Sequence, residues 1–74
     1  MSKETYLMEA LTRDLIQRNM EETGATMRQA MDKVYNSRTY MLLTNPATGL
    51  YFQSESYVYD ILAEELDATQ PATS

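Results

Sequence analysis

Apolar residues recur at helical spacing over the first third of the chain. Residues 4–22 contain no Gly or Pro and are rich in strong helix formers, so a helix is predicted there. Ser2 suits its N-cap, and Gly24 suits the left-handed residue that ends it. One apolar stripe holds Leu7, Met8, Leu11 and Leu15. Ile16 and Met20 point toward a second sector, so on that side we expect either another helix of the same fold or a second chain.

A second helix is predicted to begin directly after Thr26. Thr26 and Gln29 have the spacing of a capping box, and Asn36 suits the residue that ends the helix after Tyr35. One helical face collects Met27, Ala30, Met31, Val34 and Tyr35. We expect this whole face to be buried.

The middle of the chain is predicted to hold a short helix and a turn. Ser37 suits the N-cap of a helix over residues 38–43. The run Asn45-Pro46-Ala47-Thr48-Gly49 favours a turn, because proline presets one dihedral angle and glycine accepts a positive φ. An extended segment is expected over residues 50–52. The flanks of the turn are also compatible with strands, so a β-hairpin over residues 39–53 stays open as the alternative.

A fourth helix is predicted after Ser54, which suits its N-cap and precedes the acidic Glu55. Its apolar face holds Val58, Ile61, Leu62 and Leu66. The predicted fold is therefore all-α, a small bundle of three main helices plus one short helix, in a single domain over residues 1–67. The alternative is an α+β fold with the hairpin at 39–53. Residues 68–74 are small or polar and are predicted to form a disordered tail.

The short length of 74 residues limits the size of the core. A domain of this size buries only about 60% of the surface of its unfolded chain, and it usually gains stability from disulfides, a metal or a partner subunit. The chain has no cysteine and no histidine. Unusually good internal packing or oligomerisation remains, and the two apolar sides of the first predicted helix favour a homo-oligomer, specifically a homodimer.

The charges are distributed unevenly along the chain. All six Lys and Arg residues lie in the first 38 positions, whereas the segment from Thr39 onward has five acids and no base. Nucleic acid is not expected as a partner, because phosphate binding needs clustered basic residues, whereas a basic protein surface would be attracted. No apolar run is long enough for a membrane span or a signal peptide, so we expect a cytoplasmic protein without membrane contact.

Residues for catalysis or metal binding are scarce. Most acid–base and nucleophilic mechanisms use His or Cys, so the sequence argues against an enzyme, and no cofactor is expected. Ser37 and Lys33 are four residues apart and could form a catalytic Ser–Lys pair. A helix-cap serine beside a surface lysine is the commoner explanation of this spacing. Asp60 and Glu64 provide two carboxylates on one helix face, which are too few for a metal site.

Tyrosines are the most distinctive residue type. Six tyrosines accompany one phenylalanine and no tryptophan, and tyrosine suits both cores and interfaces. Tyr57 and Tyr59 are two positions apart on the predicted helix, so they cannot share a face. The candidate interface residues are Ile16, Met20, Tyr51, Phe52, Tyr57 and Tyr59.

Three segments in the second half of the chain resemble a family of short uncharacterised proteins of anaerobic, gut-type bacteria. These segments are Val34-Tyr35-Asn36-Ser37-Arg38-Thr39-Tyr40, Thr48-Gly49-Leu50-Tyr51-Phe52-Gln53-Ser54 and Tyr57-Val58-Tyr59. The resemblance implies a bacterial cytoplasmic protein, sometimes encoded beside modules of toxin–antitoxin type. It carries no catalytic or binding residues to this chain.

The predicted function is a non-enzymatic, self-associating protein–protein interaction module. The alternative is an antitoxin-like regulator that binds a basic partner protein, with a weak DNA contact left open. The helix–break–helix outline around Asn36 and Ser37 is the basis for that contact, although Arg38 is the only base on the second of these helices.

Overall fold

Helices account for nearly all of the regular structure in the computed structural model, which describes residues 2–69. The elements are α1 (Lys3–Thr23), α2 (Met27–Tyr35), α3 (Arg38–Leu43), η1 (Pro46–Thr48), η2 (Leu50–Phe52) and α4 (Glu55–Thr69). The two η elements are single turns of 3-10 helix. The all-α prediction is confirmed. No strand occurs in residues 2–69, so the alternative hairpin at 39–53 is wrong.

The predicted helix ends use the expected capping residues. The Ser2 hydroxyl accepts a hydrogen bond from the Thr5 N–H at 3.1 Å, and Gly24 ends α1 with a φ of +75°. At the start of α2, the Gln29 N–H donates to the Thr26 hydroxyl and the Thr26 N–H donates to the Gln29 side chain, at 3.2 and 2.9 Å. These contacts complete the predicted capping box and start α2 immediately after α1 ends.

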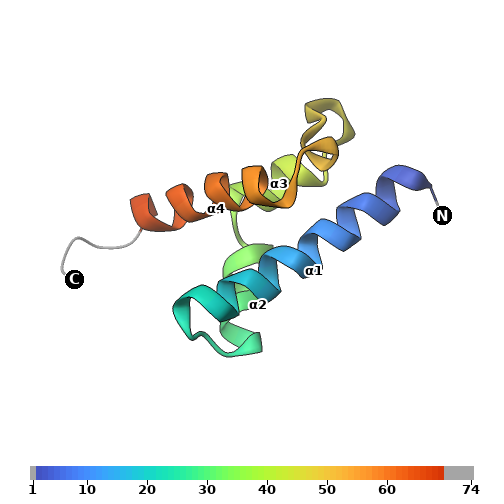
Figure 1. Ribbon diagram of the computed structural model, residues 1–74. Coiled ribbons are helices and arrows are strands. Elements are labelled where there is room, and N and C mark those ends of the chain that lie inside the picture. The colour runs from blue at the N-terminus through green and yellow to red at the C-terminus, as the bar shows by residue number, and fades with distance from the viewer. Residues whose placement is uncertain (1, 70–74) are drawn as a thin grey trace.

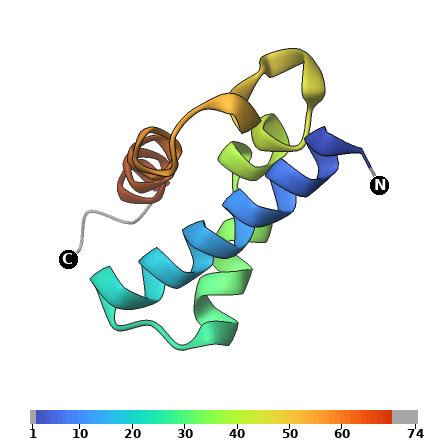
Figure 2. The ribbon, with the colours of Figure 1, turned by 45° about the vertical axis from the view of Figure 1, so that its right-hand side comes forward.

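The helices pack around one core of buried side chains. In Figure 1, α1 runs diagonally across the molecule, α2 packs against it, and α3 lies beside α4. Helix α4 is seen nearly end-on in Figure 2 and contacts both α1 and α3. The buried apolar residues are Leu11, Leu15, Ile16, Ala30, Val34, Leu43, Leu50, Tyr51, Val58, Tyr59 and Leu62.

Residues 50–52 differ from the prediction of an extended segment. They form η2, with the Phe52 N–H donating to the Gly49 carbonyl at 3.1 Å. Gly49 has a φ of +66°, and the Thr48 hydroxyl donates to the Leu42 carbonyl at 2.6 Å. This closed turn directs Leu50 into the core. Unlike an extended segment, the helical turn satisfies its backbone hydrogen bonds without a partner strand.

The last helix is longer than predicted. Helix α4 continues through Ala68 to Thr69, so the first two residues of the predicted tail are helical. Residues 70–74, the rest of that predicted tail, lie outside the described residues.

The structure decides between the two alternatives for the second sector of α1, and it corrects the prediction for the α2 face. The second sector of α1 meets α2 of the same chain, since Ile16 is buried and Met20 packs against the core. A second chain is therefore not needed to cover α1. The α2 face, in contrast, is only half covered: Ala30 and Val34 are fully buried, but the remaining apolar residues of that face are exposed.

Candidate protein-interaction surface

The outer side of α2 carries a row of exposed apolar side chains. Met27, Met31 and Tyr35 are 59%, 38% and 46% exposed. Residues four positions apart lie one above the other on a helix, so these three side chains form a stripe along α2. Isolated exposed apolar residues are common, but a contiguous apolar row is typical of an interaction surface. This stripe is hereafter called the α2 stripe.

A groove of ≈ 330 Å³ runs between the α2 stripe and α1. Ile16 and Met20 line it from α1, with Arg13 and Gln17 as its polar residues. Methionine is unbranched and adapts to irregular surfaces, so methionine-rich grooves can accept the apolar face of another helix. The groove extends the apolar surface of the stripe from α2 to α1.

Tyr35 is held in place at one end of the stripe. Its ring packs edge-on against the Tyr40 ring of α3, with the ring centroids 5.1 Å apart. The same two rings line a second hollow of ≈ 360 Å³, together with Met8 and Thr12 of α1. The Tyr35 ring therefore has a packing partner within the single chain.

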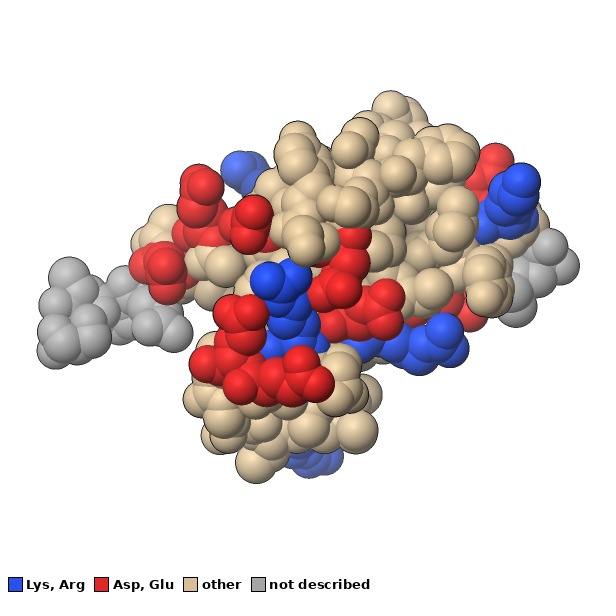
Figure 3. Space-filling model, in the orientation of Figure 1, with Lys and Arg blue, Asp and Glu red and all other residues tan. Residues whose placement is uncertain are grey.

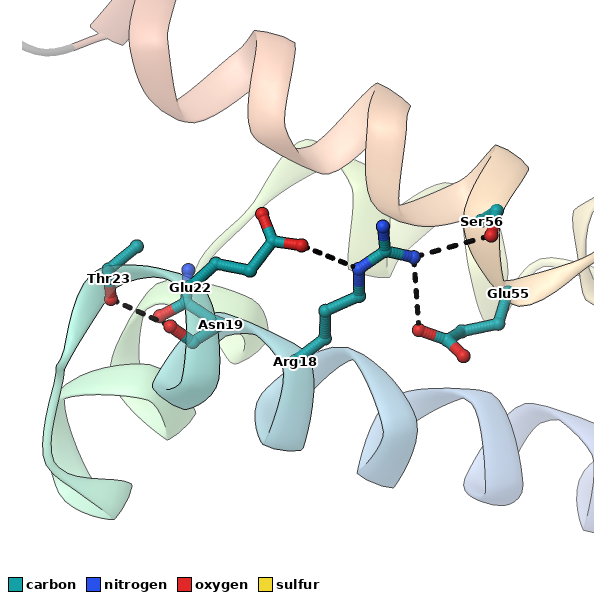
Figure 4. A network of polar contacts seen from close by, with 6 residues as sticks. All are labelled: Arg18, Asn19, Glu22, Thr23, Glu55 and Ser56. Atoms are coloured by element: carbon teal, nitrogen blue, oxygen red, sulfur yellow. Dashed lines mark hydrogen bonds and ion pairs between the residues drawn. The ribbon is translucent and has the colours of Figure 1, made fainter.

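A polar network centred on Arg18 joins α1 to the start of α4 (Figure 4). Its guanidinium donates to Glu22 at 3.0 Å, to Glu55 at 3.4 Å and to the Ser56 hydroxyl at 3.3 Å. It also lies 4.7 Å from the centroid of the Tyr59 ring. The hydrogen bond to Glu22 is the largest of the effects that together raise the pKa of Arg18, so the cation is held in its charged form. The network therefore links α1 to the first turn of α4.

Acidic side chains surround this network. The hollow beside Arg18 is lined by Asp14, Gln17, Glu21, Glu22 and Glu55. Figure 3 shows acidic side chains gathered over the C-terminal half of α1 and again toward the C-terminal end of α4. This face of the molecule would attract a basic surface.

Glu65 of α4 completes the N-terminus of α3, which the sequence did not predict. Its carboxylate accepts hydrogen bonds from the Arg38 N–H at 2.6 Å, the Thr39 N–H at 2.9 Å and the Thr39 hydroxyl at 2.7 Å. The Tyr40 N–H donates to the Ser37 hydroxyl at 3.0 Å. The next N–H, of Met41, donates to the Ser37 carbonyl. The first four N–H groups of α3 are thus all satisfied.

Of the residues considered above for catalysis or metal binding, the serine caps a helix and the two carboxylates lie exposed on the surface. Ser37 is buried, and its hydroxyl donates to the Val34 carbonyl at 2.6 Å while accepting from Tyr40, so it caps α3 and is not positioned by Lys33. Asp60 and Glu64 are exposed on α4. Within residues 2–69 no group of three or more acidic side chains is placed to hold a metal ion.

The six candidate interface residues separate into two groups. Ile16, Tyr51 and Tyr59 are 9%, 8% and 5% exposed, so they belong to the core and are removed from the candidate interface. Met20 lines the groove beside the α2 stripe, and Phe52 and Tyr57 are exposed. The prediction that Tyr57 and Tyr59 occupy different faces is confirmed.

Met27, Met31 and Tyr35 are missing from the interface predicted from the sequence, because the apolar spacing predicts that their whole helix face is buried. A usable signal was present, because five apolar positions on a nine-residue helix form a face wider than one neighbouring helix covers.

No protein-family model, curated protein or solved structure matches this chain. The resemblance to short proteins of anaerobic bacteria stays a prediction. Among the described residues, no helix combines the length and the apolar character that a membrane crossing requires.

Proposed function

We propose that this chain is a non-enzymatic protein–protein interaction module that associates with a second copy of itself. The observation that carries the proposal is the exposed α2 stripe together with its adjoining groove. A small domain without cysteine or histidine has few other means of gaining stability, and covering this surface removes apolar area from water. A bacterial cytoplasmic setting belongs to the same proposal.

The lack of catalytic residue types supports a binding role over catalysis. The chain has neither His nor Cys, and the Ser37 hydroxyl is already used as a helix cap. Turnover of a substrate that is abolished by one carboxylate or serine substitution would contradict this part of the proposal.

Light scattering over a concentration series tests self-association. We expect the molar mass of the wild type to rise from the 8.5 kDa of one chain toward twice that value. Met27→Glu places a charge in the α2 stripe and should remain monomeric at concentrations where the wild type is dimeric. Met41→Glu is the matched control, since Met41 is 70% exposed on α3 and should leave the association unchanged.

Circular dichroism of each variant checks that the helices are retained. A wild type that stays monomeric at every concentration would overturn the proposal.

A second candidate function is an antitoxin-like regulator that binds a basic partner protein. The acidic hollow lined by Asp14, Glu21, Glu22 and Glu55 favours it. In a pull-down from a host that encodes the chain, a basic protein should be recovered with the wild type and lost with Asp14→Lys/Glu21→Lys. Recovery of no basic protein would contradict it. The accompanying weak DNA contact through Arg38 would appear as a gel shift that salt abolishes.

A further inference from the structure

We propose that two copies of the chain meet through antiparallel α2 helices, with Met31 on the twofold axis. This inference rests on the proposed self-association and names its surface. Met31 is the middle residue of the α2 stripe, four positions from Met27 and four from Tyr35. Since a twofold interface uses the same patch on both copies, a symmetric stripe of this kind can pair with itself.

Antiparallel pairing about Met31 brings unlike apolar side chains together. Met27 of one copy lies at the height of the partner's Tyr35, and the same contact occurs a second time by symmetry. A thioether beside an aromatic ring is a favourable contact. The edge-on packing of the Tyr35 ring against Tyr40 restricts its rotamers in the single chain, which lowers the cost of ordering it on association.

The polar edge of α2 is complementary to itself in this arrangement. Arg28 and Asp32 lie on the edge of the stripe opposite to the buried Ala30 and Val34. Both are exposed, and neither takes part in an ion pair among residues 2–69. An antiparallel twofold keeps this edge on the same side in both copies. Arg28 then faces the partner's Asp32, offset along the helix axis by about 3 Å, two residues of helical rise.

A parallel pair lacks this complementarity. A twofold axis along the helices turns the Arg28 and Asp32 edge of one copy toward the opposite edge of the other, where α1 packs on Ala30 and Val34. Charge complementarity therefore selects the antiparallel arrangement.

The short length of α2 limits the expected affinity of the dimer. A helix of nine residues is only about 13 Å long, so the contact lies at the small end of specific interfaces, below about 1,200 Å². We expect a dissociation constant on the order of micromolar.

Disulfide trapping tests the position of the axis. The chain has no cysteine, so Met31→Cys introduces a single thiol. Two copies of a residue on the axis lie close enough to be bridged, and mild oxidation should convert this variant to a covalent dimer. Met27→Cys should not link to itself, because its two copies lie about 12 Å apart along the axis, but it should link to Tyr35→Cys in a mixture. Met41→Cys is the exposed control and should link slowly.

Charge reversal tests the polar edge. Arg28→Asp and Asp32→Arg should each weaken the dimer by about tenfold, because each variant replaces two attractive pairs across the interface by two repulsive ones. The double variant Arg28→Asp/Asp32→Arg restores both attractive pairs and should return the dissociation constant to within about threefold of wild type.

The outcomes separate this inference from the proposed function. A wild type that is monomeric at every concentration overturns both. A dimeric wild type in which Met31→Cys links no faster than Met41→Cys overturns the antiparallel arrangement and leaves self-association standing. Failure of the double reversal to recover the affinity lost by the single reversals also overturns the arrangement.

Discussion

Removal of the Glu65 carboxylate should destabilise the fold through α3. Helix α3 has only six residues, and isolated helices of that length are not stable in water. Its N-terminus depends on Glu65, which accepts three hydrogen bonds from Arg38 and Thr39. Glu65→Ala leaves two backbone N–H groups and one hydroxyl without this acceptor.

The size of the effect follows from those contacts. Hydrogen bonds to a charged acceptor contribute about 1.5–3 kcal/mol each when buried, but Glu65 is partly exposed and water replaces part of the loss. We therefore expect Glu65→Ala to lower the free energy of unfolding by about 1–2 kcal/mol, similar to the loss of a strong helix cap. In a domain of this size each kcal/mol corresponds to about 4–8 °C in Tm.

Urea and thermal unfolding followed by circular dichroism measure the change. Glu64→Ala is the matched control, because it removes a neighbouring, exposed carboxylate from the same helix and should change stability by less than about 0.5 kcal/mol. Glu65→Gln keeps one acceptor oxygen for Thr39 but loses the charge, so its effect should be intermediate. Equal stability of Glu65→Ala and Glu64→Ala would refute the capping role.

The same contacts make stability depend on pH. Burial of the Glu65 carboxylate acts to raise its pKa, but the hydrogen bonds from Arg38 and Thr39 together outweigh burial and hold the pKa below the ordinary value of 4.5. A lowered pKa means that the stabilisation is fully present above the unfolded-state value and is lost as the pH falls through the folded-state value. The stability difference between wild type and Glu65→Gln should therefore shrink below about pH 4.5. A constant difference across that range would contradict the assignment.

Three further substitutions test other parts of the fold. Gly24→Ala should lower the free energy of unfolding by about 1 kcal/mol, because Gly24 has a φ of +75°. An added Cβ meets no other atom within 4 Å, so no clash adds to this cost, and unchanged stability would mean that the left-handed conformation is not required. Asn19→Leu should raise stability by about 1 kcal/mol, because the Asn19 side-chain carbonyl is buried without a hydrogen-bond partner; a loss would indicate that the carbonyl is satisfied. Arg18→Gln should lower Tm at low ionic strength and less so in 1 M salt, since its ion pairs are partly exposed and screened; a salt-independent difference would assign its role to packing instead.

Local features of this fold were predictable from the sequence. Capping residues act on N–H groups two or three positions away, so Ser2, Thr26 and Ser37 identified the starts of the first three helices. Gly24 similarly identified the end of α1, because glycine adopts the left-handed conformation at little cost. These assignments depend on neighbours in sequence and not on how the helices pack.

Features set by packing were not predictable in the same way. Glu65 caps Arg38 and Thr39, which lie 27 and 26 positions earlier in the chain. This contact exists only once α3 and α4 meet. The exposure of Met27 and Met31 depends on which side of α2 is covered by α1, and the periodicity alone does not specify that side. The run Leu50–Phe52 suits a strand or a helical turn equally, and the turn at Gly49 decides between them.

Amide chemical shifts recorded over a dilution series report directly which surface the second copy covers. If two copies pair through α2, we expect concentration-dependent shifts at Met27, Met31 and Tyr35 and on the groove wall of α1 at Met20, with little change at Phe52 and Tyr57. Shifts confined to Phe52 and Tyr57, or shifts that do not depend on concentration anywhere, would contradict this pairing.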